Sequence, residues 1–320
     1  MNLLTSLRYL VALAEHRHFA RAAESCHITQ PALSNALRAL EKEFGTPIVK
    51  RARSYAGLTP EGERVLATAQ RMLHEHALLQ QELASRVGQP RGRLQLGVVP
   101  TAVPVAARFA AMLQATHPGI APVVRVLSSQ ELEEGLENLS LDIALGFTDR
   151  LKKAGSFAVL PQYAEQYFLV RRVKKPARAA AAPLHLGAPM RWLDAAQFPL
   201  CLLTPEMHNR SIVDRAFAEA GATVQPVMET NSVLTLALSV LAGEVCSVLP
   251  GALVGAVRSQ VGLEALPLVE PAVATPVGFM YLAQTRSSHA LQAALALAQD
   301  ERWLQHAAQH SGSLKSRMKV

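Results

Sequence analysis

Residues 18–44, HFARAAESCHITQPALSNALRALEKEF, decide the fold of the N-terminal part of the chain. They contain two segments with helical spacing of apolar residues on either side of a polar corner. The apolar positions are Phe19, Ala22 and Ala23 in the first segment and Leu33, Leu37 and Leu40 in the second. Thr29 can cap the second helix. Pro31 fits the first turn of that helix, because amide groups there form no helical hydrogen bond that a proline could remove. The pattern predicts a helix-turn-helix, which lays its second helix in the DNA major groove. A helical hairpin with a solvated polar face is the alternative.

Polar side chains of the second helix are expected to face outward, where they can donate hydrogen bonds to base edges or phosphates. A short basic stretch follows the second helix. A basic hairpin directly after a recognition helix is typical of a wing that binds DNA phosphates. An ordinary solvated loop is the alternative. The residues predicted to bind DNA are Thr29, Gln30, Pro31, Ser34, Asn35, Arg38, Arg51 and Arg53.

A long helix is expected to begin at Thr59-Pro60-Glu61, which supplies a cap, a first-turn proline and an acidic residue. Apolar and histidine side chains then recur at alternating spacings of four and three, which is typical of a coiled-coil seam. The seam positions are Val65, Ala69, Met72, His76, Leu79 and Leu83. We predict dimerisation through this helix, with packing along its own downstream domain as the alternative.

The run from Leu7 to Ala67 resembles the DNA-binding domain of LysR-type transcriptional regulators. The matching segments are FARAAESCHITQPALSNALRALEKEFGTPIVKR and LTPEGE, and a weaker resemblance covers almost the whole chain. It implies a winged helix-turn-helix, a linker helix and a two-lobed α/β effector domain resembling the periplasmic-binding-protein fold. It also implies double-stranded DNA, RNA polymerase and further copies of the chain, as a homodimer or homotetramer, as partners. Ala36, Ala39 and Lys50 depart from the family pattern, which affects the DNA sequence preference.

Global properties agree with a DNA-binding protein outside the membrane. The chain has 320 residues, long enough for two or three domains, and a net charge of +7. The N-terminus lacks the features of a signal peptide, and no apolar run approaches about 20 residues, so a cytoplasmic location and no membrane span are expected. Three cysteines without paired spacing indicate no structural metal. GxSxG, HExxH, a phosphate-binding GKS loop and a dinucleotide fingerprint are all absent, so we expect neither an enzyme nor a cofactor.

Alternation of strands and helices after the linker predicts a parallel α/β sheet in each of two lobes. A strand is expected at Val224–Met228, and the helix at Val233–Leu241 is apolar nearly all round, which predicts burial. The predicted domains are the winged helix-turn-helix at 1–59, the linker helix at 60–87, a hinge at 88–91, the effector domain at 92–310 and a disordered tail at 311–320. Within the effector domain, lobe I covers about 92–165 and 269–310, and lobe II about 166–268.

Ligands of open α/β sheets bind beyond the carboxyl ends of the strands, where helices begin and their dipoles favour anions. Hydroxyl and amide side chains stand at three such corners, and the resemblance places the effector in the same cleft. The predicted effector-binding residues are Thr101, Ala102, Phe147, Thr148, Thr204, Met207, Asn209 and Asn231. The alternative is that they only cap helices. For Arg210, an ion pair with Asp214 is favoured over a bound anion.

The phrase LLTPEMHNRSIVDRAF resembles regulators of formate dehydrogenase genes, which implies formate or a similar small carboxylate as effector. Two other functions compete. One is a redox-sensing regulator that uses Cys201 and Cys246, although both lie among apolar residues of expected strands, which favours inert buried thiols. The other is a solute-binding protein, which would need an export signal.

Overall fold

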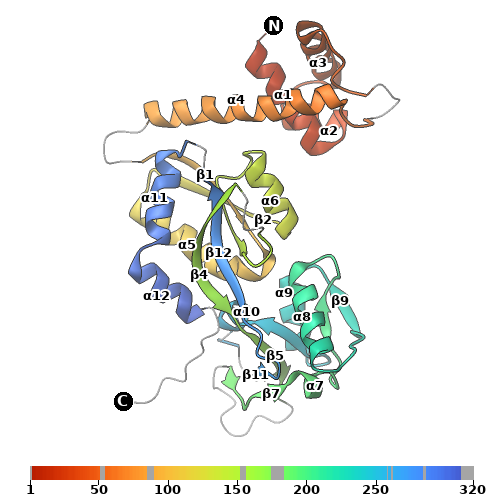
Figure 1. Cartoon of the computed structure of the whole chain (residues 1–320), viewed down its shortest axis with the longest axis vertical. Coiled ribbons are helices and arrows are strands. Elements are labelled where there is room, and N and C mark those ends of the chain that lie inside the picture. The colour runs from red at the N-terminus through yellow and green to blue at the C-terminus, as the bar shows by residue number, and fades with distance from the viewer. Residues whose placement is uncertain are drawn as a thin grey trace. The chain divides into compact units, whose positions relative to one another are not determined.

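The computed structural model describes residues 2–50, 55–84, 90–151, 156–173, 184–257, 259–260, 262–283 and 286–310. The chain forms two compact units, one built mainly from residues 1–86 and the other mainly from residues 87–320 (Figure 1). The predicted wing residues Arg51 and Arg53, residues 88 and 89 of the predicted hinge and the tail at 311–320 lie outside the described residues. Of the helices in the described ranges, none combines the length and the apolar character needed to cross a bilayer.

Within its described residues, the N-terminal unit is built from the helices α1 (Leu3–His16), α2 (Phe19–Ser25), α3 (Gln30–Phe44) and α4 (Pro60–Ala84). Their inward faces form one apolar core, in which Leu10, Leu13, Leu33 and Leu40 are fully buried. The small side chains of Ala22 and Ala23 let α2 approach its neighbours closely, as the sequence predicts. Burial of this shared core holds the helix-turn-helix in place.

The connection from α3 to α4 is held by a short antiparallel bridge between Val49 and Leu58. Thr59 fastens its base, because its amide donates to the Ile48 carbonyl at 2.9 Å and its hydroxyl also accepts from the Gly62 amide at 2.9 Å. A Cβ atom at Gly62 would overlap the Ile48 carbonyl oxygen, so only glycine fits there without movement. This bridge lies at the base of the segment predicted to form the wing.

The linker helix α4 leaves part of its apolar stripe uncovered. Ala69 is buried in the N-terminal core, whereas Met72, Leu79 and Leu83 are 40%, 51% and 78% exposed. An exposed apolar row at coiled-coil spacing is what a helix that pairs with a second copy would show.

The first sheet of the effector unit has the order β2-β1-β3-β12-β4, with β12 antiparallel to both of its neighbours. Its strands are β1 (Gly92–Val98), β2 (Ile120–Val126), β3 (Ile143–Phe147), β4 (Phe157–Glu165) and β12 (Thr275–Leu282). The accompanying helices are η1 (Pro100–Ala102), α5 (Val103–Thr116), α6 (Ser129–Glu137), α11 (His289–Ala298) and α12 (Glu301–His310). Phe109 packs against both Phe279 and Trp303 in the core of this lobe.

The second lobe combines a sheet of order β10-β5-β11-β6, to which β7 adds by pairing with β11, with a two-stranded sheet of β8 and β9. Its strands are β5 (Tyr167–Arg172), β6 (His185–Leu186), β7 (Met190–Arg191), β8 (Cys201–Leu203), β9 (Met228–Thr230), β10 (Ser247–Pro250) and β11 (Leu263–Val269). Its helices are α7 (Trp192–Ala195), α8 (His208–Glu219), α9 (Val233–Ala242) and α10 (Gly251–Ala256).

The chain crosses between the two sheets twice. The first crossing is Gln166, between β4 and β5, and the second lies between β11 and β12 (Figure 1). The two crossings are adjacent, because Thr275 at the start of β12 pairs with Glu165 at the end of β4.

The expectation of parallel sheets was wrong in part, because β12 in the first lobe and β5 in the second run antiparallel to both of their neighbours. Two local predictions were also wrong. The expected strand at Val224–Met228 begins only at Met228, because Pro226 has no amide hydrogen to give and pairing with β8 starts two residues later. The helix expected to be buried, α9, packs only Leu236 and Val240 into the core. Leu234 and Leu238, on its other face, are 66% and 53% exposed.

Candidate DNA interface and effector cleft

Helix α3 presents a polar face to solvent. Thr29 caps the helix by accepting from the Ala32 amide at 3.4 Å, and Gly45 ends it with a φ of 65°. With Leu33, Leu37 and Leu40 buried, the opposite face is left to the residues predicted to bind DNA. Gln30, Pro31, Asn35 and Arg38 are exposed, and Ser34 is half-buried.

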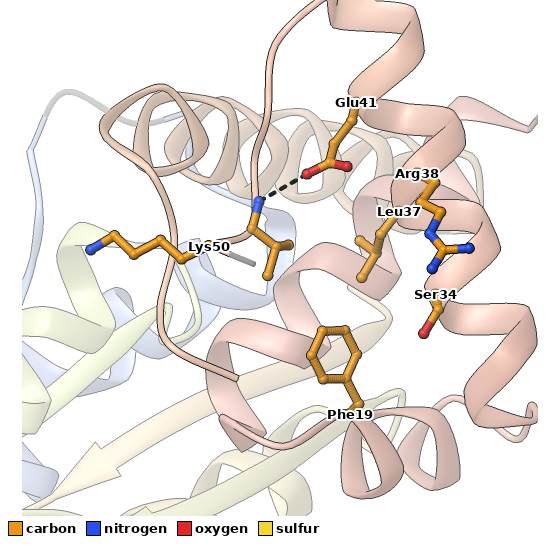
Figure 2. Close-up of a pocket in the computed structure, with 7 residues that line it drawn as sticks. Phe19, Ser34, Leu37, Arg38, Glu41 and Lys50 are labelled. Atoms are coloured by element: carbon orange, nitrogen blue, oxygen red, sulfur yellow. Dashed lines mark hydrogen bonds between the residues drawn. The ribbon is translucent and has the colours of Figure 1, made fainter. Parts of the chain in front are cut away.

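A hollow of about 370 Å³ lies beside this face, between α2, α3 and the chain leading into the wing. Figure 2 shows Phe19 and Leu37 at its apolar floor and Ser34 and Arg38 along α3. Its lining consists of Phe19, Ser34, Leu37, Arg38, Glu41, Val49 and Lys50. The lining contains two cationic side chains, Arg38 and Lys50, which can contact the phosphates of a DNA strand, and one carboxylate, Glu41.

Glu41 fixes the position of the wing relative to α3. Its Oε1 atom accepts from the amides of Ile48 at 2.8 Å and Val49 at 3.1 Å; the second bond is dashed in Figure 2. This role of Glu41 was not predicted. Spacing along α3 does not distinguish Glu41 from the exposed Glu43, and the partners are backbone groups seven and eight residues away.

The effector unit contains a narrow cleft between its two lobes. Its free space is about 10 Å³, about the volume that one water molecule needs. The lining residues are Val99, Pro100, Thr101, Ser128, Ser129, Phe147, Leu203, Met207, His208 and Asn209. Four of the predicted effector residues are among them: Thr101, Phe147, Met207 and Asn209.

The other four predicted residues do not line the cleft. Ala102 is buried in the core of the first lobe. The Thr148 hydroxyl donates to the Pro276 carbonyl at 3.4 Å, and the Thr204 hydroxyl donates to Glu206 at 2.7 Å. Asn231 is exposed beyond the end of β9. Three of these residues follow strands as expected, namely Thr148, Thr204 and Asn231. The two threonine hydroxyls form hydrogen bonds within neighbouring loops, and Asn231 faces solvent.

Three buried polar atoms in the cleft have no hydrogen-bond partner among the described residues: Thr101 Oγ1, Ser129 Oγ and His208 Nε2. His208 Nε2 lies 3.5 Å from Asp149 Oδ1, longer than a good hydrogen bond, and its ring packs against Phe147. Burial lowers the pKa of His208 more than Asp149 raises it, so the neutral imidazole predominates at neutral pH.

Ser129 and His208 were not predicted. A signal for the serine does exist, because Ser128 and Glu131 form a capping box at the start of α6, with bonds of 2.8 and 3.3 Å. A capping box marks the start of a helix. The start of α6, where Ser129 lies, meets the starts of η1 and α8 at the cleft. His208 directly follows the predicted Met207 and begins α8.

The guanidinium of Arg210 is bound by neighbouring protein groups. It contacts Asp214 at 2.8 Å and the Leu203 carbonyl at 2.6 Å, and it also pairs with Glu229. The favoured pair with Asp214 is therefore confirmed, and the guanidinium is not directed at a ligand.

Cys201 and Cys246 are buried on neighbouring strands, and the Cys201 amide donates to the Cys246 carbonyl at 2.8 Å. Because Leu200 is the partner of Cys246 in the parallel bridge, the side chain of Cys201 points to the opposite face. The two thiols accordingly belong to different apolar clusters. Burial raises the pKa of the Cys201 thiol, which disfavours the reactive thiolate.

Comparison with known proteins covers both units. Residues 4–63 match the family model described as "Bacterial regulatory helix-turn-helix protein, lysR family", and residues 88–303 match "LysR substrate binding domain". The chain is 30% identical over 284 residues to the DNA-binding transcriptional dual regulator OxyR of Escherichia coli, covering 87% of this chain and 88% of the relative. It is 32% identical over 162 residues to an SDS degradation transcriptional activation protein of a Pseudomonas species, covering 50% and 53% of the two chains.

Solved structures share the fold. A full-length OxyR variant from Pseudomonas aeruginosa, with one cysteine replaced by aspartate, aligns with a TM-score of 0.65 and 26% identity, over 92% of this chain and 96% of that one. Full-length CbnR in complex with its target DNA aligns with a TM-score of 0.64 at 18% identity, over 95% and 99% of the two chains.

Proposed function

The chain belongs to the LysR family of DNA-binding transcriptional regulators, and from this premise we propose that a small carboxylate in the cleft controls its action on DNA. Members of the family bind DNA as oligomers. Family membership does not identify the effector. The proposal that the effector is a small carboxylate is based on the residues that line the cleft.

The observation that carries the proposal is the pair of unpartnered hydroxyls of Thr101 and Ser129, together with His208 Nε2, whose contact with Asp149 is 3.5 Å long. A buried hydroxyl without a partner costs about 1–3 kcal/mol, which a ligand that accepts its hydrogen bond would recover. Each of the three residues lies at the start of a helical segment, namely η1, α6 and α8. Free amides and helix dipoles at such positions favour an anion.

The size and charge of the cleft restrict the ligand further. The free space of about 10 Å³ is that of one water molecule, so even an acid of three heavy atoms requires the lining to open around it, which favours the smallest acids. None of the lining residues is a lysine or arginine. A dianion would lack a counter-charge in the cleft. A monovalent acid such as formate can be held by the hydroxyls, by the amides at the helix starts and by one proton on His208. A negative ligand also raises the pKa of an adjacent histidine, so binding should draw a proton onto His208.

Calorimetry on the full chain tests the proposal, with formate and acetate as probes. We expect formate to bind, and Thr101→Val, which keeps the side-chain shape and removes the hydroxyl, to weaken binding about tenfold, the effect of one lost hydrogen bond. Thr204→Val is the matched control, because the Thr204 hydroxyl serves Glu206 outside the cleft lining. Absence of binding heat from these acids with a folded protein, or equal losses in both variants, would contradict the carboxylate assignment.

A second candidate function is redox sensing, which the likeness to OxyR favours, since relatives of 28–30% identity are named hydrogen peroxide-inducible genes activators. The opposite orientation of Cys201 and Cys246 weighs against a disulfide between them in this arrangement. Peroxide treatment followed by measurement of DNA affinity separates the two functions. A peroxide response abolished by Cys201→Ser or Cys246→Ser would favour redox sensing over the carboxylate.

The proposed mechanism has three parts. Two copies pair through the exposed stripe of α4, and effector units pair further to give a tetramer. The paired α3 helices bind spaced half-sites in promoter DNA. The effector favours one arrangement of the lobes, which changes the DNA bend and the access of RNA polymerase and activates transcription; only unequal affinity for two arrangements can drive this change. The genes for formate dehydrogenase are the proposed target if formate is the effector.

A further inference from the structure

A carboxyl group is completely buried at the first crossing between the lobes. Glu165, the last residue of β4, has no exposed surface. Its Oε1 atom accepts from the Ala252 amide at 3.1 Å. The neighbouring Gly251 amide donates to the Gln166 carbonyl at 2.9 Å and is close enough to oppose the rise in the pKa of Glu165. Both amides belong to the first turn of α10, in the second lobe. One carboxyl group of the first sheet thus bonds to a helix of the second lobe.

No cation compensates this carboxyl among the described residues. β4 contributes the Tyr163 hydroxyl, which interacts electrostatically with Glu165. Neither the Tyr163 hydroxyl nor Glu165 Oε2 has a hydrogen-bond partner of good geometry among the described residues. β5 contributes Tyr167, and β12 contributes the Thr275 hydroxyl, which lies opposite Glu165 in the sheet. α12, which also packs against β4, carries His306, whose ring lies 6.2 Å from that of Trp303.

Burial without a counter-charge strongly favours the neutral acid. It raises the pKa of Glu165 to about 8, even though the α10 amides oppose the shift. The carboxylic acid therefore predominates at neutral pH while the strands and α10 enclose it.

A chain of polar contacts joins this crossing to the effector cleft. The Tyr167 hydroxyl lies 3.2 Å from the Thr275 hydroxyl and 3.5 Å from Asn209 Nδ2. Asn209 lines the cleft, and Thr275 is the sheet partner of Glu165. A shift of the cleft residues against the first lobe would therefore disturb the surroundings of Glu165.

We propose that Glu165 is a proton-linked switch between the lobes: the arrangement described here holds the neutral acid, and a rearrangement that opens the crossing to water releases its proton to solvent. The equilibrium between the two arrangements then changes by up to about tenfold per pH unit over the interval in which only one arrangement holds the proton. This inference does not depend on which effector the cleft binds.

Infrared spectroscopy of the full chain without ligand, labelled at glutamate, tests the inference directly. We expect a protonated-carboxyl band at about pH 6 that disappears by about pH 10 with a midpoint near 8. Glu165→Gln should lack this component, and Glu219→Gln, a change at an exposed glutamate of α8, should keep it. Small-angle scattering over the same pH range should show a change of dimensions that Glu165→Gln abolishes.

Two results would overturn the inference. One is a wild-type spectrum without the band at about pH 6, which decides the matter even if Glu165→Gln does not fold. The other is a pH-dependent change of dimensions that persists unaltered in Glu165→Gln. Neither result bears on formate binding, so the failure of this inference is distinguishable from failure of the carboxylate assignment.

Discussion

Replacing Glu41 with alanine should loosen the wing without touching the base-reading face. The substitution removes both hydrogen bonds to the Ile48 and Val49 amides, at 2.8 and 3.1 Å. A hydrogen bond to a charged group is worth about 1.5–3 kcal/mol, and the partial exposure of this carboxyl lowers the total for the pair to about 2–3 kcal/mol. We expect the N-terminal unit to lose about 2 kcal/mol of stability, and the affinity for DNA to fall about tenfold on every sequence alike.

Urea unfolding followed by gel-shift titration on several DNA sequences measures both effects. Glu43→Ala removes an exposed carboxylate from the same turn of α3 and is the matched control, because it changes the charge equally. Glu41→Gln should give an intermediate effect, since its amide oxygen can still accept. If Glu41→Ala left stability unchanged, or altered the order of preference among sequences, the role assigned to Glu41 would be wrong.

The remaining predictions concern both units. Asn35→Ala should change which DNA sequences bind best, in a selection from random sequences; an equal loss on every sequence would exclude base contact by Asn35. Gly62→Ala should destabilise the N-terminal unit by about 1–3 kcal/mol in urea unfolding, because its methyl group overlaps the Ile48 carbonyl; an unchanged midpoint would refute the overlap. Formate affinity should rise as the pH falls from about 8 to about 6, because binding protonates His208, and calorimetry on His208→Asn should show a flatter pH profile. Because folding raises the pKa of Glu165 from 4.5 to about 8, its contribution to stability is complete below pH 4.5 and is lost as the pH rises through about 8. The free energy of unfolding should therefore fall by up to about 1.4 kcal/mol per pH unit in that window, and Glu165→Gln should remove this component from urea unfolding curves.

The helix-turn-helix could be predicted because its determinants are local. The apolar spacing, the Thr29 cap and the Gly45 stop all act within one or two helical turns, and the structure has α3 at Gln30–Phe44. Glu41 escaped prediction because its partners are backbone amides beyond the end of the helix, where side-chain spacing carries no signal.

The cleft was predicted only in part for a related reason. Strand ends and helix starts are visible in the sequence, and Thr101 and Asn209 follow from them. Which side of each loop faces the cleft depends on tertiary packing, so Thr204 and Asn231 were included while Ser129 and His208 were missed. The exposed face of α9 was likewise hidden, because a helix that is apolar all round gives no indication of which side the protein covers.

The claim that the exposed face of α3 binds double-stranded DNA is tested most directly by gel-shift titration of the full chain on the DNA upstream of its own gene. We expect DNA binding that weakens steeply as salt is added and a binding midpoint that moves when formate is present. Absence of any complex at low ionic strength, from a preparation shown to be folded, would contradict it.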